Sequence, residues 1–404
     1  MLQRNGPVPE HTGPGFSSRR IDLDGVALPL SDHLIVIAPN GRVVALNPGG
    51  RRLWEALQAG CTVDNLVEAS VQEGDLSEDV ARTRISRALA SWRALGLIDA
   101  AAREIEPSPL ASSVLTRPAS RAWELDEIYL PGDRPVRVRC EDRVLAGVIE
   151  AACRSCRFGD AAGAFATVDV TEQDGGFAVR ADDAVLARAD DLTQNPALAR
   201  HRCLTALLES SRQPRRWLGI LHASAVGAGG RCVIFPGARG AGKSTLSAAL
   251  VAAGADLVTD DYAPLEQASW LIWPVPYAPG IKRGSWRPLR RRYPGLLSLP
   301  VHRLAGAQIR YLDLEAAHMA PLDRGLPVGA MVFPRYEAGA KLEQQRLTPA
   351  EAMAGICHAR SLLERRPEVL AETLRWVESV PAYRLSYGDL DPAVEWVCSL
   401  LDAS

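Results

Sequence analysis

The stretch 232–245 reads CVIFPGARGAGKST. Its first four residues form a short apolar run typical of a buried strand, and the pattern G-x-x-x-x-G-K-S follows directly at 237–244. Glycines let successive backbone N–H groups surround phosphate oxygens, and a helix over 246–253, closed by Gly254, would add the positive end of its dipole. The sequence therefore predicts a nucleotide-binding loop between a strand and a helix of an α/β domain.

The residues of this loop have separate expected roles. Lys243 is expected to reach the β- and γ-phosphates, and the Ser244 hydroxyl to ligate Mg²⁺, so ATP and Mg²⁺ are the expected cofactors. A chance match in a Gly- and Ala-rich stretch is the alternative, but the flanking strand and helix that the motif needs are both indicated. The predicted nucleotide-binding set is Gly237, Ala238, Arg239, Gly240, Ala241, Gly242, Lys243, Ser244 and Thr245.

A pair of carboxylates follows the loop closely. Between Lys243 and the pair Asp260-Asp261 there is room for one helix and one strand. This spacing places both aspartates at the carboxyl end of a strand, where ligands of open α/β sheets bind. We expect Ser244 and Asp261 to hold the metal, and either aspartate to take a proton from an attacking hydroxyl. The alternative is that the pair only caps the next turn.

A histidine precedes the loop. The apolar segment 221–226 contains His222 and is followed by the glycine-rich turn 227–230, so a hairpin with the strand that enters the loop is expected. This would bring His222 near the phosphates as a catalytic residue beside Asp260 and Asp261. A lone histidine on a strand is more often a hydrogen-bonded structural residue, which stays open as the alternative.

These segments resemble the core of HPr serine kinase and its relatives, the group that shares its nucleotide fold with phosphoenolpyruvate carboxykinase. The resemblance covers about 120–400 and is strongest over 219–262. It implies that an aspartate of the acidic pair activates an acceptor serine, that Ser244 holds Mg²⁺, and that His222 supports the site. Further segments resemble the HPr-kinase-related branch found beside peptide-modification genes, namely 279–285, 309–312 and 332–336.

The chain departs from HPr kinase in one segment. The family's stretch with a Glu and an Arg-Gly-rich run has no clear counterpart, and the comparable region reads Lys-Arg-Gly-Ser at 282–285. Phosphorylase activity and HPr itself as substrate are therefore not expected. The run 282–292 is strongly basic, which fits either a solvated face or contacts with ATP phosphates or an acidic peptide. Segment 333–336 could also place Arg335 near the nucleotide.

A separate small domain is predicted near the N-terminus. Apolar residues at 35–37 and 43–46 flank the turn Pro39-Asn-Gly41 and indicate a β-hairpin. Two strands and three helices in so short a stretch suggest a winged-helix-like α+β module. The three helices are expected to begin at Asn47-Pro48, at Thr62, and ahead of an apolar face at Ile85, Leu89, Trp92 and Leu95 that ends at Gly96.

This module resembles the PqqD-like domain, the recognition element that binds leader peptides of ribosomally made, post-translationally modified peptides. The resemblance rests on the pattern of elements, on VALNPGG at 44–50 and on the closing LGLI at 95–98. It implies that the N-terminal domain recognises the leader of a precursor peptide. A winged helix that binds DNA is the alternative.

Composition favours an enzyme with a binding module. The 404 residues suffice for two or three domains with 47% hydrophobic residues, and a formal net charge of −2 gives no general attraction to nucleic acid. No signal segment or membrane span is recognisable, so a cytoplasmic location is expected. Among 8 cysteines only Cys153 and Cys156 have metal or redox spacing, and without a second such pair nearby they are predicted as reduced structural thiols.

Together these patterns predict an ATP- and Mg²⁺-dependent kinase for a Ser or Thr hydroxyl of a precursor peptide. A non-catalytic ATP-binding adaptor and a kinase of a small metabolite are the rivals, and a buried or turned-away Asp260 would favour the adaptor. Other peptide-modifying enzymes and a homo-oligomer stay open as partners, and neither nucleic acid nor membrane is expected. The expected organisation is a disordered tail (1–22), a PqqD-like domain (23–100), a linker (101–118) and a P-loop, HPr-kinase-like catalytic domain with a mixed sheet (119–404).

Overall fold

The chain divides into two compact units, 1–113 and 114–404. This division falls within the predicted linker, and the linker and the predicted tail both lie outside the described residues. The computed structural model describes residues 23, 25–38, 42–72, 77–98, 122–159, 163–173, 175–181, 193–212, 216–359 and 361–402.

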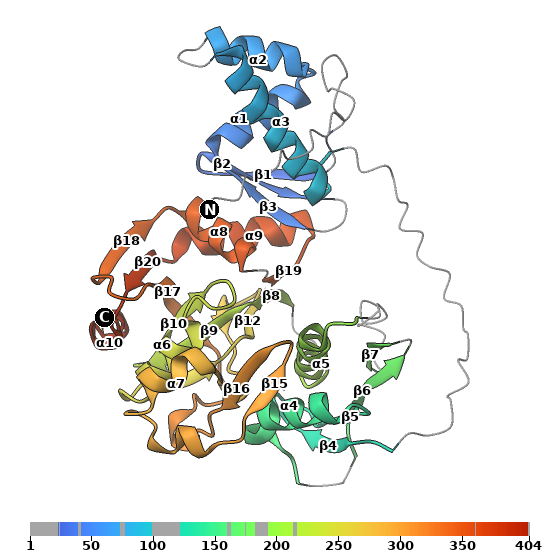
Figure 1. The fold of residues 1–404 in the computed structure, drawn as a ribbon, viewed down its shortest axis with the longest axis vertical. Helices are drawn as coiled ribbons and strands as arrows, with labels where there is room; N and C mark the ends of the chain where they lie inside the picture. Colours follow the sequence, from blue (N-terminus) through green and yellow to red (C-terminus); the bar gives the residue numbers. More distant parts are fainter. Residues whose placement is uncertain are drawn as a thin grey trace, which may run out of the picture. The chain divides into compact units, whose positions relative to one another are not determined.

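The N-terminal unit is a small α+β domain (Figure 1). Its strands make an antiparallel sheet of order β1-β2-β3. Leu34 and Val36 of β2 pack against the helices, where the rings of Trp54 and Trp92 lie 5.6 Å apart. Its described elements are β1 (Val26–Leu30), β2 (His33–Ile37), β3 (Val43–Leu46), α1 (Pro48–Gln58), α2 (Val63–Gln72) and α3 (Glu78–Leu95).

The predicted hairpin and helices of this unit are confirmed. Strands β2 and β3 pair antiparallel, although their turn at 39–41 lies outside the described residues. Asn47 caps α1 by accepting a hydrogen bond from the Gly50 N–H, and Gly96 ends α3 in the left-handed region with φ +77°. Strand β1 was not expected, because VALPL at 26–30 contains a proline and no polar alternation. It pairs with one edge of β2, so within the described residues β3 is the strand of the hairpin with an unpaired edge.

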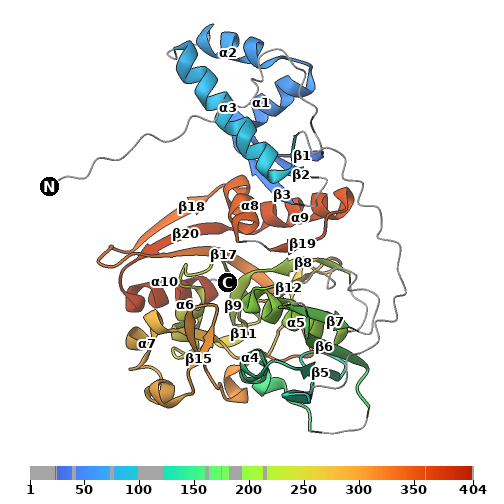
Figure 2. The same cartoon turned by 45° about the vertical axis from the view of Figure 1, so that its right-hand side comes forward.

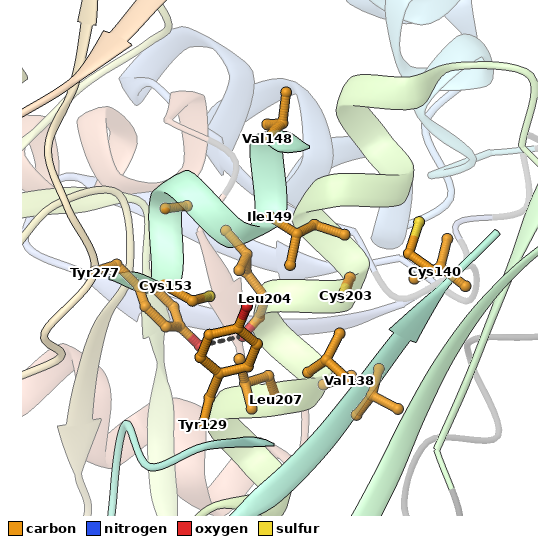
Figure 3. Close-up of a cluster of buried hydrophobic side chains, with 14 of the residues drawn as sticks. Tyr129, Val138, Cys140, Val148, Ile149, Cys153, Cys203, Leu204, Leu207 and Tyr277 are labelled. Atoms are coloured by element: carbon orange, nitrogen blue, oxygen red, sulfur yellow. Dashed lines mark hydrogen bonds between the residues drawn. The ribbon is translucent and has the colours of Figure 1, made fainter. Parts of the chain in front are cut away.

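The first part of the C-terminal unit is a four-stranded sheet of order β4-β5-β6-β7, with α4 and α5 packed on it. Figure 3 shows Val138 facing Leu204 and Leu207 of α5 in this core. The Tyr277 hydroxyl enters the same core and donates a hydrogen bond to the Leu204 carbonyl at 2.9 Å. The elements are β4 (Leu125–Tyr129), β5 (Val136–Cys140), α4 (Arg143–Cys153), β6 (Ala166–Gln173), β7 (Gly176–Ala181) and α5 (Pro196–Ser210).

The rest of this unit is built on a large mixed sheet. Its described helices and strands are β8 (Trp217–Leu221), β9 (Ala223–Ala228), β10 (Arg231–Pro236), α6 (Lys243–Val251), β11 (Asp256–Thr259), β12 (Ala263–Glu266), β13 (Leu271–Ile272), β14 (Gly280–Lys282), α7 (Arg283–Leu289), β15 (His302–Leu304), β16 (Ala307–Tyr311), β17 (Leu326–Tyr336), β18 (Glu343–Leu347), α8 (Pro349–His358), β19 (Leu362–Leu363), α9 (Pro367–Ser379), β20 (Ala382–Tyr387) and α10 (Leu390–Asp402). Single 3-10 turns occupy Arg154–Cys156, Pro294–Ser298 and Ala316–His318.

The described strands of the large sheet run in the order β11-β9-β10-β17-β13-β12-β8-β19, with β20 beside β17 and β18 beside β20. Only the pairs β10–β17 and β17–β20 are parallel. Helices α6 and α10 lie on one face of this sheet and α8 on the other (Figures 1 and 2). Phe235 and Val332 pack in the core with α6 and α10, whereas the ring of Phe333 meets Gly355 of α8. A separate sheet of order β14-β16-β15 lies beside α7. The expected mixed α/β sheet is therefore present.

Two chain segments pass from one part of the large sheet to the other at the same place. One part contains β9 and β11, and the other contains β8 and β12. Strand β8 continues into β9, and β11 continues into β12, while β8 pairs with β12 and β9 pairs with β11. Leu221 faces Ala263 on one side of the crossing, and Ala225 faces Thr259 on the other. The crossing therefore brings residues 222–224 next to residues 260–262.

The junction of β8 and β19 offers a test of this packing. A Cβ at Gly219 would lie 2.5 Å from the Leu362 carbonyl oxygen, a backbone atom that cannot move alone. We expect Gly219→Ala to lower the free energy of unfolding by on the order of 2 kcal/mol. Gly147→Ala, in α4 with nothing within 4 Å of the new Cβ, is the matched control and should be neutral or stabilising. Urea unfolding of both variants measures the difference, and equal stability would contradict the packing at Gly219.

Candidate functional site

The glycine-rich loop connects β10 to α6, as the sequence predicts. Gly240 and Gly242 adopt φ values of +92° and +103°, which other residues rarely adopt. At Gly242 a side chain would also meet a neighbour, since its Cβ would lie 2.8 Å from the Tyr387 hydroxyl. The loop conformation therefore depends on glycine at this position for two independent reasons.

Lys243 begins α6 and lies across the loop. Its side chain is nearly buried, and its Nζ donates to the Gly237 carbonyl at 2.8 Å and approaches the Ala238 carbonyl at 3.4 Å. The same nitrogen lies 3.4 Å from Nε2 of His222. The predicted hairpin of β9 with β10 is confirmed, and it is what brings His222 to the loop.

Asp260 is a buried carboxylate that joins three elements. Its Oδ1 accepts hydrogen bonds from the hydroxyls of Ser224, on β9, and Ser244, on α6, the latter at 2.9 Å. Its Oδ2 accepts from the Gly280 N–H of β14 at 3.2 Å. Burial and the charge of Asp261 raise the pKa of Asp260, and the two hydroxyls act in the opposite direction.

Asp261 is arranged differently, although it is the next residue. Its backbone lies in the left-handed region with φ +67°, which turns its side chain away from that of Asp260, and the side chain is 32% exposed. Burial acts to raise the pKa of Asp261, but the contact with His222 and the charges of Lys243 and Arg200 hold it below its ordinary value. The two carboxylates are thus driven apart in pKa, a pattern that marks functional sites.

His222 lies between Lys243 and Asp261. Its Nδ1 is 2.7 Å from the Ala359 carbonyl, an acceptor only, so Nδ1 carries the hydrogen of this bond. Its Nε2 faces both Lys243 Nζ and Asp261 Oδ1, each at 3.4 Å. Nε2 can therefore accept from the lysine when the ring is neutral, or donate to the aspartate when it is protonated.

Lys243, Asp261 and His222 border one polar pocket of about 210 Å³, whereas Asp260 is not among the residues that line it. This volume is below the range typical of pockets that enclose a whole small ligand, so we expect the pocket to surround the charged end of one. The loop, the crossing, α5 and the β14-β16-β15 sheet each supply part of its wall. Its charged and polar side chains include Arg200, His201, His222, Arg239, Lys243, Ser244, Thr245, Asp261, Tyr262, Lys282, Ser285 and Tyr311.

The sequence did not reveal the wall formed by α5. Ala197, Arg200 and His201 line the pocket at helical spacing, which the pattern in 196–210 shows only once the orientation of the helix is known. Burial lowers the pKa of His201 to about 4, and the charge of Arg200 acts in the same direction, so His201 is neutral near pH 7. Its Nδ1 lies 3.1 Å from the Tyr262 hydroxyl.

Other expected residues are only partly brought to the site. Of the basic side chains in the run 282–292, Lys282 alone lines the pocket, and burial lowers its pKa. Arg335 does not line this pocket, since its side chain is 65% exposed and pairs with Glu337, and its expected place near the nucleotide stays a prediction. Strand β17 ends there at the surface, so its last residues face solvent.

The thiols and possible metal clusters are also settled for the described residues. Cys153 and Cys156 are buried free thiols, as expected, and burial raises the pKa of Cys153. No group of three or more His, Cys, Asp or Glu side chains suited to a metal occurs in the described part of the chain. None of the helices described there is long and apolar enough to cross a membrane.

Comparison with known proteins identifies one part of the chain. Residues 32–98 match the family model of coenzyme PQQ synthesis protein D (PqqD). The N-terminal unit therefore contains a PqqD-like domain, as predicted, and the match supports a role in peptide recognition. No curated protein matches the chain.

The neutral His201 leads to a prediction on pH. Because its pKa falls from 6.5 to about 4 on folding, the unfolded chain binds a proton in this window that the folded chain does not. The free energy of unfolding should therefore fall as pH decreases from 6.5 to 4, by on the order of 2 kcal/mol from this group. His201→Asn, which can still reach the Tyr262 hydroxyl, should reduce this pH dependence in urea unfolding. An unchanged slope would show that His201 titrates normally.

Proposed function

We propose that this chain is an ATP- and Mg²⁺-dependent kinase that phosphorylates a Ser or Thr hydroxyl of a ribosomally synthesised precursor peptide. The observation that carries the proposal is the hydrogen bond from Ser244 to Asp260 beside Lys243, at the start of the helix that follows a glycine-rich loop. A glycine-rich loop, a lysine, a hydroxyl and one carboxylate line the pocket, and a second carboxylate accepts a hydrogen bond from that hydroxyl; phosphoryl transfer uses these parts.

The proposed nucleotide contacts follow from the loop. Backbone N–H groups of 237–242 and the N-terminus of α6 would bind the phosphates. Lys243 already donates to loop carbonyls, so it lies at the loop and can exchange these acceptors for phosphate oxygens. Resemblance to HPr serine kinase supports the same assignment.

The donor set fits Mg²⁺. Ser244 Oγ and Asp260 Oδ1 are oxygen donors 2.9 Å apart, and Mg²⁺ is usually held by one or two protein oxygens, with phosphates and water completing the shell. We therefore assign the carboxylate of the metal set to Asp260 rather than to the Asp261 expected from sequence. When bound, Mg²⁺ would neutralise charge on the phosphate oxygens.

Asp261 is the better candidate for the base. Its carboxylate lines the pocket and is held ionised, so it can accept the proton of an acceptor hydroxyl. His222 positions it through Nε2, and the Ala359 carbonyl fixes the orientation of the ring. Phosphoryl transfer requires mainly positioning and charge neutralisation, so a base of low pKa is sufficient.

An ATP-binding adaptor without catalysis is the second candidate. The burial of Asp260 favours it, since a buried Asp260 cannot serve as the base. The same burial suits a residue that orients Ser244 and a metal, and Asp261 still faces the pocket. The two candidates therefore differ in what Asp261 does.

The PqqD-like domain supports a peptide as the substrate. Strand β3 pairs with no other strand on one side among the residues that the structure describes, and an extended leader can add to such an edge, with main-chain hydrogen bonds providing affinity. Val43, Val44 and Ala45 are partly exposed on this strand and would contact the side chains of the leader.

Removal of the loop lysine tests nucleotide binding. We expect Lys243→Ala to weaken ATP binding by on the order of 100-fold, because the cation at the β- and γ-phosphates is lost. Lys341→Ala, which removes an exposed lysine, is the control and should bind ATP normally. Isothermal calorimetry measures both, and an unchanged affinity of Lys243→Ala would exclude this nucleotide site.

Substitutions in the acidic pair separate binding from chemistry. Asp261→Asn should leave ATP affinity within a few-fold yet slow phosphate transfer by on the order of 100-fold or more. Asp260→Asn should instead weaken the Mg²⁺-dependent part of ATP binding. Calorimetry with and without Mg²⁺ and mass spectrometry of the precursor provide the two measurements. Normal phosphate transfer by Asp261→Asn would exclude Asp261 as the base. Absence of phosphate transfer by the unmodified chain would favour the adaptor.

Deletion of residues 1–100 tests the role of the N-terminal domain. The fragment 101–404 should bind ATP almost normally but show a higher KM for the full-length precursor, because leader contacts are remote from the phosphoryl group. Phosphate incorporation is measured at several precursor concentrations, with a leaderless peptide as the control substrate. Equal rates for fragment and whole chain on sub-saturating full-length precursor would assign the domain to another partner.

A further inference from the structure

Two polar groups in the pocket have no hydrogen-bond partner among the described residues. Nε of Arg200 is buried without one, and no ion pair joins the Arg200 guanidinium to a described carboxylate. The Tyr311 hydroxyl, on β16, is also buried without a partner, and the tyrosine is only 5% exposed. Both residues line the pocket, and the guanidinium carbon lies 5.8 Å from the centre of the Tyr311 ring.

The nearby carboxylates are already engaged. Asp260 accepts three hydrogen bonds, and Asp261 contacts His222. The charges of both aspartates raise the pKa of Arg200, but neither aspartate forms an ion pair with it. An unpaired buried polar group costs about 1–3 kcal/mol, and more if it is charged, so a fold retains such groups where a ligand completes them.

The chemistry of the two groups defines that ligand. A guanidinium presents a planar set of N–H donors that matches two oxygens of a phosphate or a carboxylate, and a phenol adds one O–H donor. The group that satisfies both donors is an oxyanion.

We propose that Arg200 and Tyr311 form an oxyanion-binding subsite on the α5 and β16 wall of the pocket, in addition to the phosphate contacts of the loop. Its oxyanion comes from one of two sources, the terminal phosphoryl group of the nucleotide or a carboxylate of the acceptor close to its hydroxyl. These two sources rest on the proposed kinase function, whereas the subsite itself does not.

Binding of inorganic phosphate tests the subsite directly. Phosphate is titrated by calorimetry into the full chain, with and without MgADP, for the unmodified protein, Arg200→Gln and Tyr311→Phe. We expect Arg200→Gln to weaken phosphate binding by about tenfold or more and Tyr311→Phe by a few-fold. Arg290→Gln, which changes an exposed arginine of α7's C-terminal end, is the control and should have no effect. Unchanged phosphate affinity in Arg200→Gln overturns the proposal. If Arg200→Gln does not fold, an unchanged phosphate affinity in Tyr311→Phe overturns the proposal instead.

Nucleotide and acceptor measurements then identify the source. If the terminal phosphoryl group binds there, Arg200→Gln weakens binding of ATP but not of ADP. If an acceptor carboxylate binds there, Arg200→Gln leaves the ratio of ATP to ADP affinity unchanged. It then raises KM for a peptide with a carboxylate close to the acceptor hydroxyl, but not for the same peptide with that carboxylate amidated. Failure of the kinase proposal would look different, because the unmodified chain would not bind ATP while its phosphate binding still depended on Arg200.

Discussion

The structure of the pocket depends on the hydrogen bonds to the Asp260 carboxylate. Ser224, Ser244 and the Gly280 N–H reach it from the central sheet, the loop helix and the β14 strand. A buried carboxylate is tolerated only with such partners, and loss of one side of a buried hydrogen-bonded pair is far more costly than its net contribution suggests. The carboxylate thus fixes three elements relative to each other and prevents Asp260 from serving as a mobile proton acceptor. In the proposed kinase that role would belong to Asp261, whose side chain lines the pocket.

The crossing of two segments explains why adjacent aspartates can differ so much. In a regular strand Asp260 and Asp261 would point to opposite faces, one of them into the helices that cover the sheet. Here β11 ends before Asp260, and the left-handed backbone of Asp261 lets the chain change from one half of the sheet to the other. Aspartate tolerates this conformation better than most residues. Because β8 and β9 cross at the same point, His222 meets Asp261 there without a long loop on either side.

The sequence predicted those parts of the site that are formed by residues close together in the chain. The loop, its flanking strand and helix, the β9–β10 hairpin and the position of the acidic pair depend on contacts between near neighbours, so 221–262 alone indicated them. Arg200 and Tyr311 reach the pocket from a preceding helix and a later small sheet, and nothing local distinguishes them from other residues of an amphipathic helix or a strand. The separate roles of Asp260 and Asp261 were also beyond the sequence, because they depend on one φ angle and on Gly280. Strand β1 was missed since its stability comes from pairing with β2 rather than from its own pattern.

The residues of the site fall into two sets, and only one of them distinguishes the proposed kinase from an ATP-binding adaptor. The loop, Lys243, Ser244 and Asp260 form one connected set of contacts, which both proposed functions would use to bind phosphates and a metal. Asp261 is connected to that set only through His222, whose Nε2 lies 3.4 Å from both Asp261 Oδ1 and Lys243 Nζ. The left-handed backbone of Asp261 is explained by the crossing of the two segments, so it does not distinguish a kinase from an adaptor. The two proposals differ instead in whether the Asp261 carboxylate, which lines the pocket, accepts a proton from a second substrate.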